Sequence, residues 1–339
     1  MQQYSTVASR NLIRAEQKML KHAEPIIVLG KFGAQKEMPK NMTDTLVFRR
    51  LVPFNAAANG TPQITASNFV LAEGTTPTPN TITYVDVSVS LQQYGVLFKY
   101  SSKVEYMYED NIPDDMAKLT GETLAEVKEL AQYGVCRGGT GVIYANGASR
   151  AAVNTAVSLA KLRRAARTLQ SNRAMKVTQM LSPSVNFGTK AVEKGYIVFH
   201  HTDCNSDVRD LPGFTRVADY GNRKPICDEE VGSCEEFRFI ATPLLAPFLA
   251  SGSATINGMV SQGAANVDVY PMIVMAEEAW GQVALKGKGA ISPTRIPASQ
   301  KNHANPLGQF GYVGADFWYA AVRLNENFMT RLEVGVTDL

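Results

Sequence analysis

Hydrophobic and polar residues alternate in two stretches of the first third of the chain, 43–54 and 82–101. In the second stretch, valines at every other position from Val85 to Val89 fall on one face of a strand, with polar residues on the other. The residues between the two stretches are rich in proline, asparagine and threonine. This pattern predicts a β-arm, two long strands joined by an irregular polar tip.

The β-arm is almost uncharged. Leu51 to Phe98 contains two charged residues, Glu73 and Asp86, and no lysine or arginine. Its prolines and many polar residues argue against a membrane span, which needs roughly 20 predominantly apolar residues. A two-stranded ribbon is marginally stable alone in water, and its open edges can pair with another chain. We therefore expect the β-arm to mediate self-association.

Helical spacing of apolar residues predicts three helices. A short pattern covers 8–23, within an N-terminal arm that extends to residue 45. A long helix is expected at 114–133, after the start signal Pro113 and before a glycine cluster. We expect one stripe of this helix to pack on the sheet, with Val127 at its centre. The members of the stripe are Leu119, Thr123, Val127, Leu130 and Gly134.

The third helix, expected at 155–173, is strongly basic. Residues 131–192 contain nine basic residues and no acidic one. One interpretation is a solvated face that is balanced by acidic residues in 228–236. The other is a surface that faces a polyanion and contacts phosphates without reading sequence.

Beyond residue 195 the pattern changes to short strands. They are expected at 196–199, 236–241, 267–275 and 281–285. A C-terminal hairpin is predicted from two further runs, 316–324 and 328–334, with its turn at 325–327. The fold class is therefore α+β.

Composition adds little chemistry. The net charge of +3 is too small to imply nucleic-acid binding by itself. The four cysteines form no CxxC pair, and the N-terminal region lacks the apolar core of a signal peptide, so we expect a cytosolic chain with reduced thiols.

Two kinds of site can be considered around residue 200. A zinc site and a Cys/His nucleophile pair are both conceivable, but the spacing lacks the close ligand pairs of zinc sites, and adjacency in sequence does not supply catalytic geometry. We therefore assign no catalytic, metal or cofactor-binding residue. The residues considered are His200, His201, Asp203, Cys204, Cys227 and Cys234.

Three segments carry a resemblance to a known family. They are Leu71-Ala-Glu73-Gly74 with Pro77, Gln93-Tyr94-Gly95 leading into Phe98–Ser102, and Asn305-Pro-Leu-Gly-Gln309 followed by Gly311, Val313-Gly314 and Ala320–Leu324. Their order and separation resemble the major capsid proteins of tailed bacteriophages, with the HK97-like fold, and the local match is close to the N4-like coat proteins. The resemblance covers Arg49 to Glu333. It departs at Trp318, which lies later than the tryptophan that relatives often carry.

The resemblance implies four regions and two kinds of functional surface. The regions are an N-terminal arm (1–45), an extended β-loop (46–101), a peripheral region (102–184) with the spine helix 114–133 and the basic helix 155–173, and an axial body (185–339). Contacts between subunits are expected on the extended loop at Glu73, Pro77, Val87 and Tyr94. Packaged DNA is expected to face Arg163, Arg164 and Arg167.

The implied function is a non-enzymatic coat protein of the virion, assembled in the bacterial host cytoplasm. Its expected partners are further copies of itself in pentamers and hexamers, double-stranded DNA bound non-specifically, portal and scaffolding proteins, and optionally a decoration protein, without a membrane. No lysine lies in Leu51–Phe98, and the nearest are Lys40 and Lys99, so we expect shells without isopeptide cross-links. Two alternatives stay open: an encapsulin-like nanocompartment, and a cytosolic hydrolase that uses His200, Asp203 and Cys204.

Overall fold

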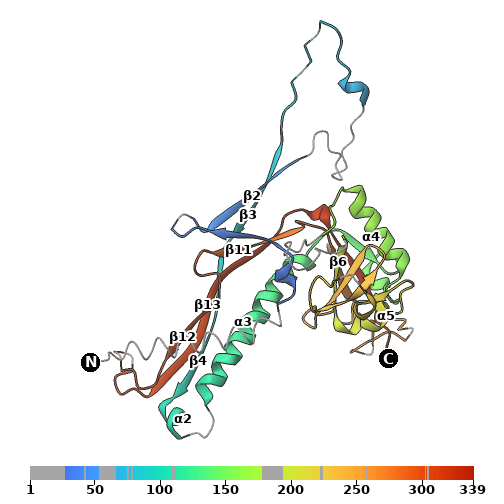
Figure 1. Cartoon of the computed structure of the whole chain (residues 1–339). Helices are drawn as coiled ribbons and strands as arrows, with labels where there is room; N and C mark the ends of the chain where they lie inside the picture. The colour runs from blue at the N-terminus through green and yellow to red at the C-terminus, as the bar shows by residue number, and fades with distance from the viewer. Residues whose placement is uncertain are drawn as a thin grey trace. The chain divides into compact units, whose positions relative to one another are not determined.

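The computed structural model describes most of the chain beyond the N-terminal arm. The described residues are 27–41, 43–52, 66–74, 76–77, 79–107, 111–177, 194–221, 224–256, 258–263, 265–301, 303 and 305–339. The helix predicted at 8–23 lies outside them. The chain divides into two compact units, each assembled from segments far apart in sequence (Figure 1). One unit draws on Met1–Leu46, Val89–Gly134 and Gly281–Val322, and the other on Val47–Ser88, Val135–Trp280 and Arg323–Leu339.

A five-stranded sheet organises the first unit. β13 lies between β4 and β12 and is antiparallel to both, and β1 joins β11 in parallel. The strands are β1 (Ala34–Met38), β4 (Gln92–Ser101), β11 (Trp280–Leu285), β12 (Ser292–Ile296) and β13 (Phe310–Arg323). Short helices η1 (Leu29–Lys31) and α2 (Ser102–Met107) flank the sheet strands in sequence.

Glycine allows β4 to pack closely on β13. Gly311 pairs with Tyr100 across the ladder, and a Cβ at Gly311 would lie 2.2 Å from the Tyr100 ring. A glycine inside a strand often marks such a close approach. The Tyr100 ring thus covers a position where no other residue type fits without displacement.

The long helix predicted at 114–133 lies within α3 (Ile112–Arg137), but its predicted buried stripe is wrong. Leu119 is 50% exposed and Leu130 is 47% exposed, whereas Leu124 and Gln132 are buried. Val127 is only half-buried. The predicted stripe includes neither Glu129 nor Gln132, and the structure buries both with hydrogen-bond partners.

A seven-stranded mixed sheet forms the core of the second unit. Its order is β5-β14-β10-β6-β9-β8-β7, and every residue of β6 and β10 is buried. The strands are β5 (Val142–Tyr144), β6 (Tyr196–His200), β7 (Thr215–Arg216), β8 (Glu230–Cys234), β9 (Phe237–Ala241), β10 (Tyr270–Met275) and β14 (Met329–Val334). Burial on both faces explains why β6 and β10 read as continuous apolar runs in the sequence.

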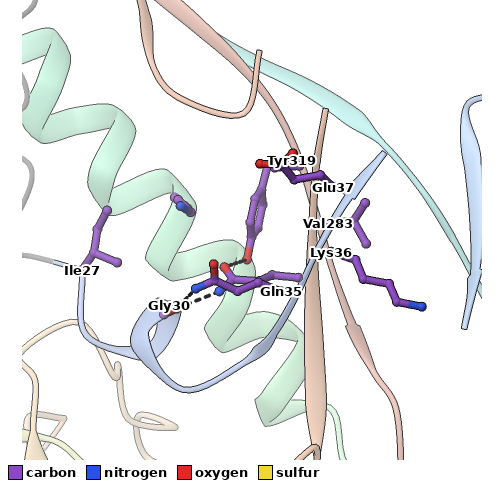
Figure 2. Close-up of a pocket in the computed structure, with 10 residues that line it drawn as sticks. Ile27, Gly30, Gln35, Lys36, Glu37, Val283 and Tyr319 are labelled. Carbon is purple, nitrogen blue, oxygen red and sulfur yellow. Dashed lines mark hydrogen bonds between the residues drawn. The ribbon is translucent and has the colours of Figure 1, made fainter. Parts of the chain in front are cut away.

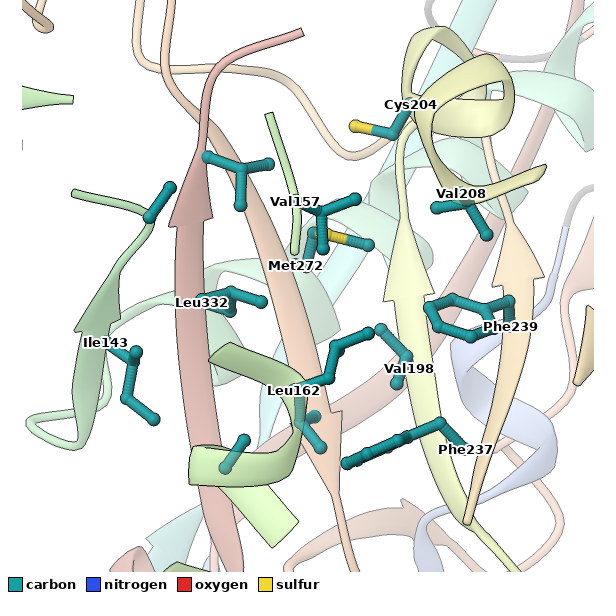
Figure 3. Packing of buried hydrophobic residues seen from close by; sticks show 14 of the residues in the cluster. Ile143, Val157, Leu162, Val198, Cys204, Val208, Phe237, Phe239, Met272 and Leu332 are labelled. Carbon is teal, nitrogen blue, oxygen red and sulfur yellow. The ribbon is translucent and has the colours of Figure 1, made fainter. Parts of the chain in front are cut away.

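Helix α4 (Leu159–Ser171) packs on this sheet. Figure 3 shows Leu162 of α4 close to Val198, Phe237 and Met272 of the strands. The helix predicted at 155–173 is therefore shorter than expected, and its N-cap is Ser158 in extended conformation. Short segments η3 (Arg150–Ala152), η4 (Thr202–Cys204), α5 (Asn205–Arg209) and η5 (Val217–Asp219) complete this unit's connections.

The C-terminal hairpin prediction is wrong. The two strands and the turn exist, with η6 (Glu326–Phe328) between β13 and β14, but the strands do not pair with each other. β13 belongs to the five-stranded sheet, and β14 pairs with β10 and β5. Alternation identifies a strand, but it does not identify the partner of that strand.

The second strand of the predicted β-arm is divided at Leu91. β3 (Tyr84–Ser90) pairs with β2 (Thr45–Leu51) in a two-stranded ribbon, whereas β4 pairs with β13 along its whole length. The ribbon is therefore shorter than predicted, because residues 92–101 form part of the core sheet. The connection between β2 and β3 includes η2 (Ala66–Phe69).

Candidate functional site

The β2–β3 ribbon is an antiparallel pair with its own cross-strand contacts. Backbone hydrogen bonds join Val52 N to Thr83 O and Leu91 N to Asp44 O. Between the strands, the Arg49 guanidinium donates to both carboxylate oxygens of Asp86, at 2.8 and 3.0 Å. This pairing lowers the pKa of Asp86 and raises the pKa of Arg49. Both side chains are exposed, so the pair orders the ribbon without adding much stability.

The ribbon and its tip expose many apolar side chains. Val70, at the tip, is 77% exposed. Isolated exposed leucines or valines are normal on protein surfaces, but a contiguous exposed set marks an interaction surface. The exposed members are Val47, Leu51, Phe69, Val70, Leu71, Ile82, Tyr84 and Val85. Together with the unpaired edges of a two-stranded sheet, they make this element suited to binding another chain.

The structure places the four residues expected at subunit contacts in different settings. Glu73 and Pro77 are exposed on the connection between β2 and β3, and Val87 is half-buried on β3. Tyr94 lies on β4 and not on the ribbon. Its ring stacks on Phe317 of β13, with centroids 5.5 Å apart. Tyr94 thus has a packing role within the five-stranded sheet, which sequence position alone did not reveal.

The three arginines of α4 also differ from one another. Arg163 forms an ion pair with Glu235, in the turn between β8 and β9. This pairing raises the pKa of Arg163 and lowers the pKa of Glu235. Arg164 and Arg167 are exposed on the helix. The acidic segment 228–236 therefore supplies a counter-charge to Arg163, although the Arg163 side chain is still 63% exposed.

The residues of the hydrolase alternative do not fit a nucleophile and its base. Cys204 is buried, and burial raises the pKa of its thiol, so the sulfur stays protonated at neutral pH. His200 is also buried, and its Nδ1 donates to the carbonyl oxygen of His201 at 2.9 Å. Asp203 instead accepts a hydrogen bond from the Tyr270 hydroxyl, at 2.9 Å.

Among the residues that the structure describes, no group of three or more histidine, cysteine or acidic side chains is arranged to hold a metal ion. No helix there is long and apolar enough to cross a membrane.

His200 should make the subunit acid-sensitive. Burial lowers its pKa to about 4, whereas the unfolded chain has the ordinary value of 6.5. The unfolded state therefore binds the proton first, so the stability contribution is complete above pH 6.5 and is lost as the pH falls toward 4. We expect this residue alone to remove roughly 3 kcal/mol over that window. Urea unfolding of the subunit at several pH values measures the loss, and His200→Leu should flatten it. An unchanged slope in His200→Leu would contradict the assignment.

A hollow of about 200 Å³ lies beside α3 in the first unit. Figure 2 shows Gly30, Gln35 and Tyr319 around it. Gln132 Nε2 donates to the Tyr319 hydroxyl at 2.7 Å, and Gln282 Nε2 donates to the Gly30 carbonyl at 2.7 Å. These polar groups bind the segment before β1 to the sheet and to α3. The arrangement is structural, and it offers no nucleophile activated by a base.

Sequence reasoning missed the buried polar contacts of this region. The backbone N–H of Leu29 donates to Glu129 Oε1 at 3.0 Å, one hundred positions along the chain. Burial also lowers the pKa of Lys128, which Glu129 partly offsets. No sequence signal marks Glu129 as buried or Lys128 as half-buried, because Glu and Lys are almost always solvent-facing.

Comparison with known proteins gives matches to solved structures. No protein-family model matches the sequence, and no curated protein matches it. A chain of the Ralstonia phage GP4 capsid aligns over 89% of this chain and 87% of its own length, with a TM-score of 0.63 and 13% identity. A chain of the cyanophage Pam1 capsid aligns over 93% and 92%, with a TM-score of 0.58 and 14% identity. A chain of the cyanophage P-SCSP1u capsid aligns over 91% and 88%, with a TM-score of 0.55 and 13% identity.

These alignments cover both units and nearly the full length of both partners in each comparison. Identities of 13 to 14% define the fold only, so they do not test the predicted likeness to N4-like coat proteins. The predicted α+β capsid fold is confirmed: the chain has the fold of phage capsid chains.

Proposed function

We propose that the chain is the major capsid protein of a tailed phage, which self-assembles into the icosahedral head around double-stranded DNA. The observation that carries the proposal is the alignment of about nine-tenths of the chain with phage capsid chains over almost their whole length. If the chain shared only one domain with a capsid protein, the alignment would leave much of one of the two compared chains unaligned. The role is structural, and its chemistry is surface burial between copies.

The β2–β3 ribbon is the proposed contact between neighbouring subunits. It combines unpaired strand edges with the exposed apolar side chains named above, and Glu73 and Pro77 lie exposed on its connection. Each contact can be weak, because closed symmetry repeats it many times and links the copies to one another. Pentamers and hexamers, a portal, scaffolding and decoration proteins are part of this proposal, as is assembly in the host cytoplasm.

The proposal is tested by particle size. Electron microscopy and analytical ultracentrifugation of the purified chain, with and without a co-expressed scaffolding candidate, should show megadalton shells. A stable small oligomer under every condition would contradict the proposal.

The DNA-facing part of the proposal concerns α4. We expect Arg164→Glu with Arg167→Glu to spare empty shells and to make DNA retention more sensitive to salt, because two phosphate-binding cations are lost. Arg163→Glu is the matched control, since Glu235 already pairs with Arg163. DNA content in filled particles, measured across a salt series, checks this. Equal salt dependence of DNA retention in all variants would show that the basic face of α4 is an ordinary solvated surface.

A further inference from the structure

Lys128 is a lysine of α3 that lines the hollow beside that helix. The hollow has a volume of about 200 Å³, and Figure 2 shows Gly30, Gln35 and Tyr319 around it. Lys128 is half-buried, and its Nζ lies 5.2 Å from the centroid of the Tyr319 ring. The hollow therefore gives a small molecule access to an amine that the rest of the protein partly encloses.

The Lys128 amine has no counter-ion in the described part of the chain. Among those residues, no carboxylate forms an ion pair with its Nζ and no acceptor forms a hydrogen bond with it. Glu129, the next residue of the helix, instead accepts a hydrogen bond from Leu29 N at 3.0 Å. Lys118 of the same helix is different, because it pairs with Asp115 at 3.6 Å. The amides that are hydrogen-bonded around the hollow thus stabilise the fold without engaging Lys128.

This environment makes the Lys128 amine more nucleophilic than that of an exposed lysine. Burial lowers its pKa, and Glu129 offsets only part of this effect. A larger fraction of the side chain is therefore neutral near pH 7, and the neutral amine is the form that attacks a carbonyl carbon. Lysines desolvated in this way are the ones that form imines with carbonyl compounds in proteins.

The lining of the hollow indicates which carbonyl compounds fit. Its volume of about 200 Å³ is below the roughly 300–1,000 Å³ of sites for drug-sized ligands, so the reactant must be small. The amides of Gln35 and Gln282 and the carboxylate of Glu37 line it and favour a reactant with hydroxyl groups. An uncharged reactant also avoids placing a second anion beside Glu37. A small hydroxylated aldehyde meets all three conditions.

We propose that Lys128 is a site of covalent modification by small polar aldehydes. The neutral Nζ adds to the aldehyde carbon, so that a C–N bond forms and the carbonyl oxygen becomes a hydroxyl group. That oxygen then leaves as water, which carries away both N–H protons of the amine, and an imine with a C=N bond remains. The step needs no oxidant or reductant. It takes place in a single subunit, so it stands or fails independently of the capsid function.

Reductive trapping tests the proposal. The purified full-length subunit is treated with glyceraldehyde and sodium cyanoborohydride, which reduces each imine to a stable secondary amine, and peptide mass spectrometry gives the labelled fraction of each lysine. Lys118 is the matched control, since it lies on the same helix and its side chain is 42% exposed. At pH 7 we expect several-fold more label on Lys128 than on Lys118. The ratio should fall to one or below at about pH 10.5, where exposed lysines also lose their protons.

A filled hollow gives a second readout. Ala284→Leu adds side-chain volume at a position that lines the hollow, and it should reduce the label on Lys128 several-fold without changing the label on Lys118. Ala290→Leu is the control substitution, because Ala290 is exposed and lies outside the lining. Equal labelling of Lys128 and Lys118 at pH 7 would overturn the proposal, and this comparison decides it if Ala284→Leu does not fold. Undiminished label on Lys128 in a folded Ala284→Leu subunit would also overturn it, since the aldehyde would then not react from the hollow.

Discussion

Replacing residues 56–81 by a short Gly-Ser turn should yield a folded, soluble subunit that forms no shells. The replacement removes the exposed apolar residues Phe69, Val70 and Leu71 together with the connection between β2 and β3. These three side chains are 46%, 77% and 69% exposed, so they add little to the packing of either unit and folding should continue without them. Sedimentation of the variant should show subunits only, with the circular dichroism spectrum and urea midpoint of the unaltered chain.

Two point variants test whether shell formation depends on the ribbon itself or on any exposed apolar side chain. Val70→Ser removes a side chain that is 77% exposed at the ribbon tip, and Leu307→Ser removes one that is 74% exposed outside the ribbon. We expect shell yield to fall for Val70→Ser and to stay constant for Leu307→Ser, because only the first lies in the proposed interface. Normal shell yield from the turn replacement would show that the ribbon is not the element that joins subunits.

Glu333→Ala should destabilise the second unit by about 3–5 kcal/mol. The Glu333 carboxylate is fully buried and accepts hydrogen bonds from Arg150, at 2.8 Å, and from Arg331, also at 2.8 Å. Its removal leaves two guanidinium groups near one another without their shared anion. Urea unfolding of the subunit measures the loss.

Asp86→Ala provides the contrast. Asp86 also forms a bidentate pair with an arginine, but both partners are exposed on the ribbon. Ion pairs between exposed groups are screened by water and contribute little to stability, so this variant should keep nearly the same unfolding midpoint. Similar losses in the two variants would mean that burial does not determine the strength of the Glu333 pairing.

The local pattern of the sequence predicted most of the helices and strands, but it did not predict which strands pair with one another. The strand at Tyr196–His200 and the helix centred on Leu124 follow from apolar spacing, which depends on near neighbours. Strand pairing depends on residues far apart in sequence. This is why the sequence pattern did not show that β4 pairs with β13, or that β14 lies in a different sheet from β13. The prediction of the buried face of α3 failed for a related reason. Hydrogen bonds with Leu29 and Tyr319, which are distant in sequence, allow Glu129 and Gln132 to be buried.

The candidate surfaces were predictable to a similar extent. Alternation located the ribbon, and the absence of lysine and arginine indicated an unusual surface. The composition of 228–236 suggested a counter-charge for α4, and the structure pairs Glu235 with Arg163. The packing of Tyr94 on Phe317 could not be anticipated, since the two residues meet only after the five-stranded sheet has formed.

The pairing of β4 with β13 has a consequence for biosynthesis. Gln93 and Asp316, which are hydrogen-bonded across this ladder, are separated by 223 residues. At roughly 5–20 residues per second, a ribosome needs about 11–45 s to deliver the second strand after the first. A truncated or stalled polypeptide therefore lacks the central strand of its sheet. Only chains translated through β13, which ends at Arg323, can complete this unit, so chains terminated earlier are excluded before they can join a growing particle.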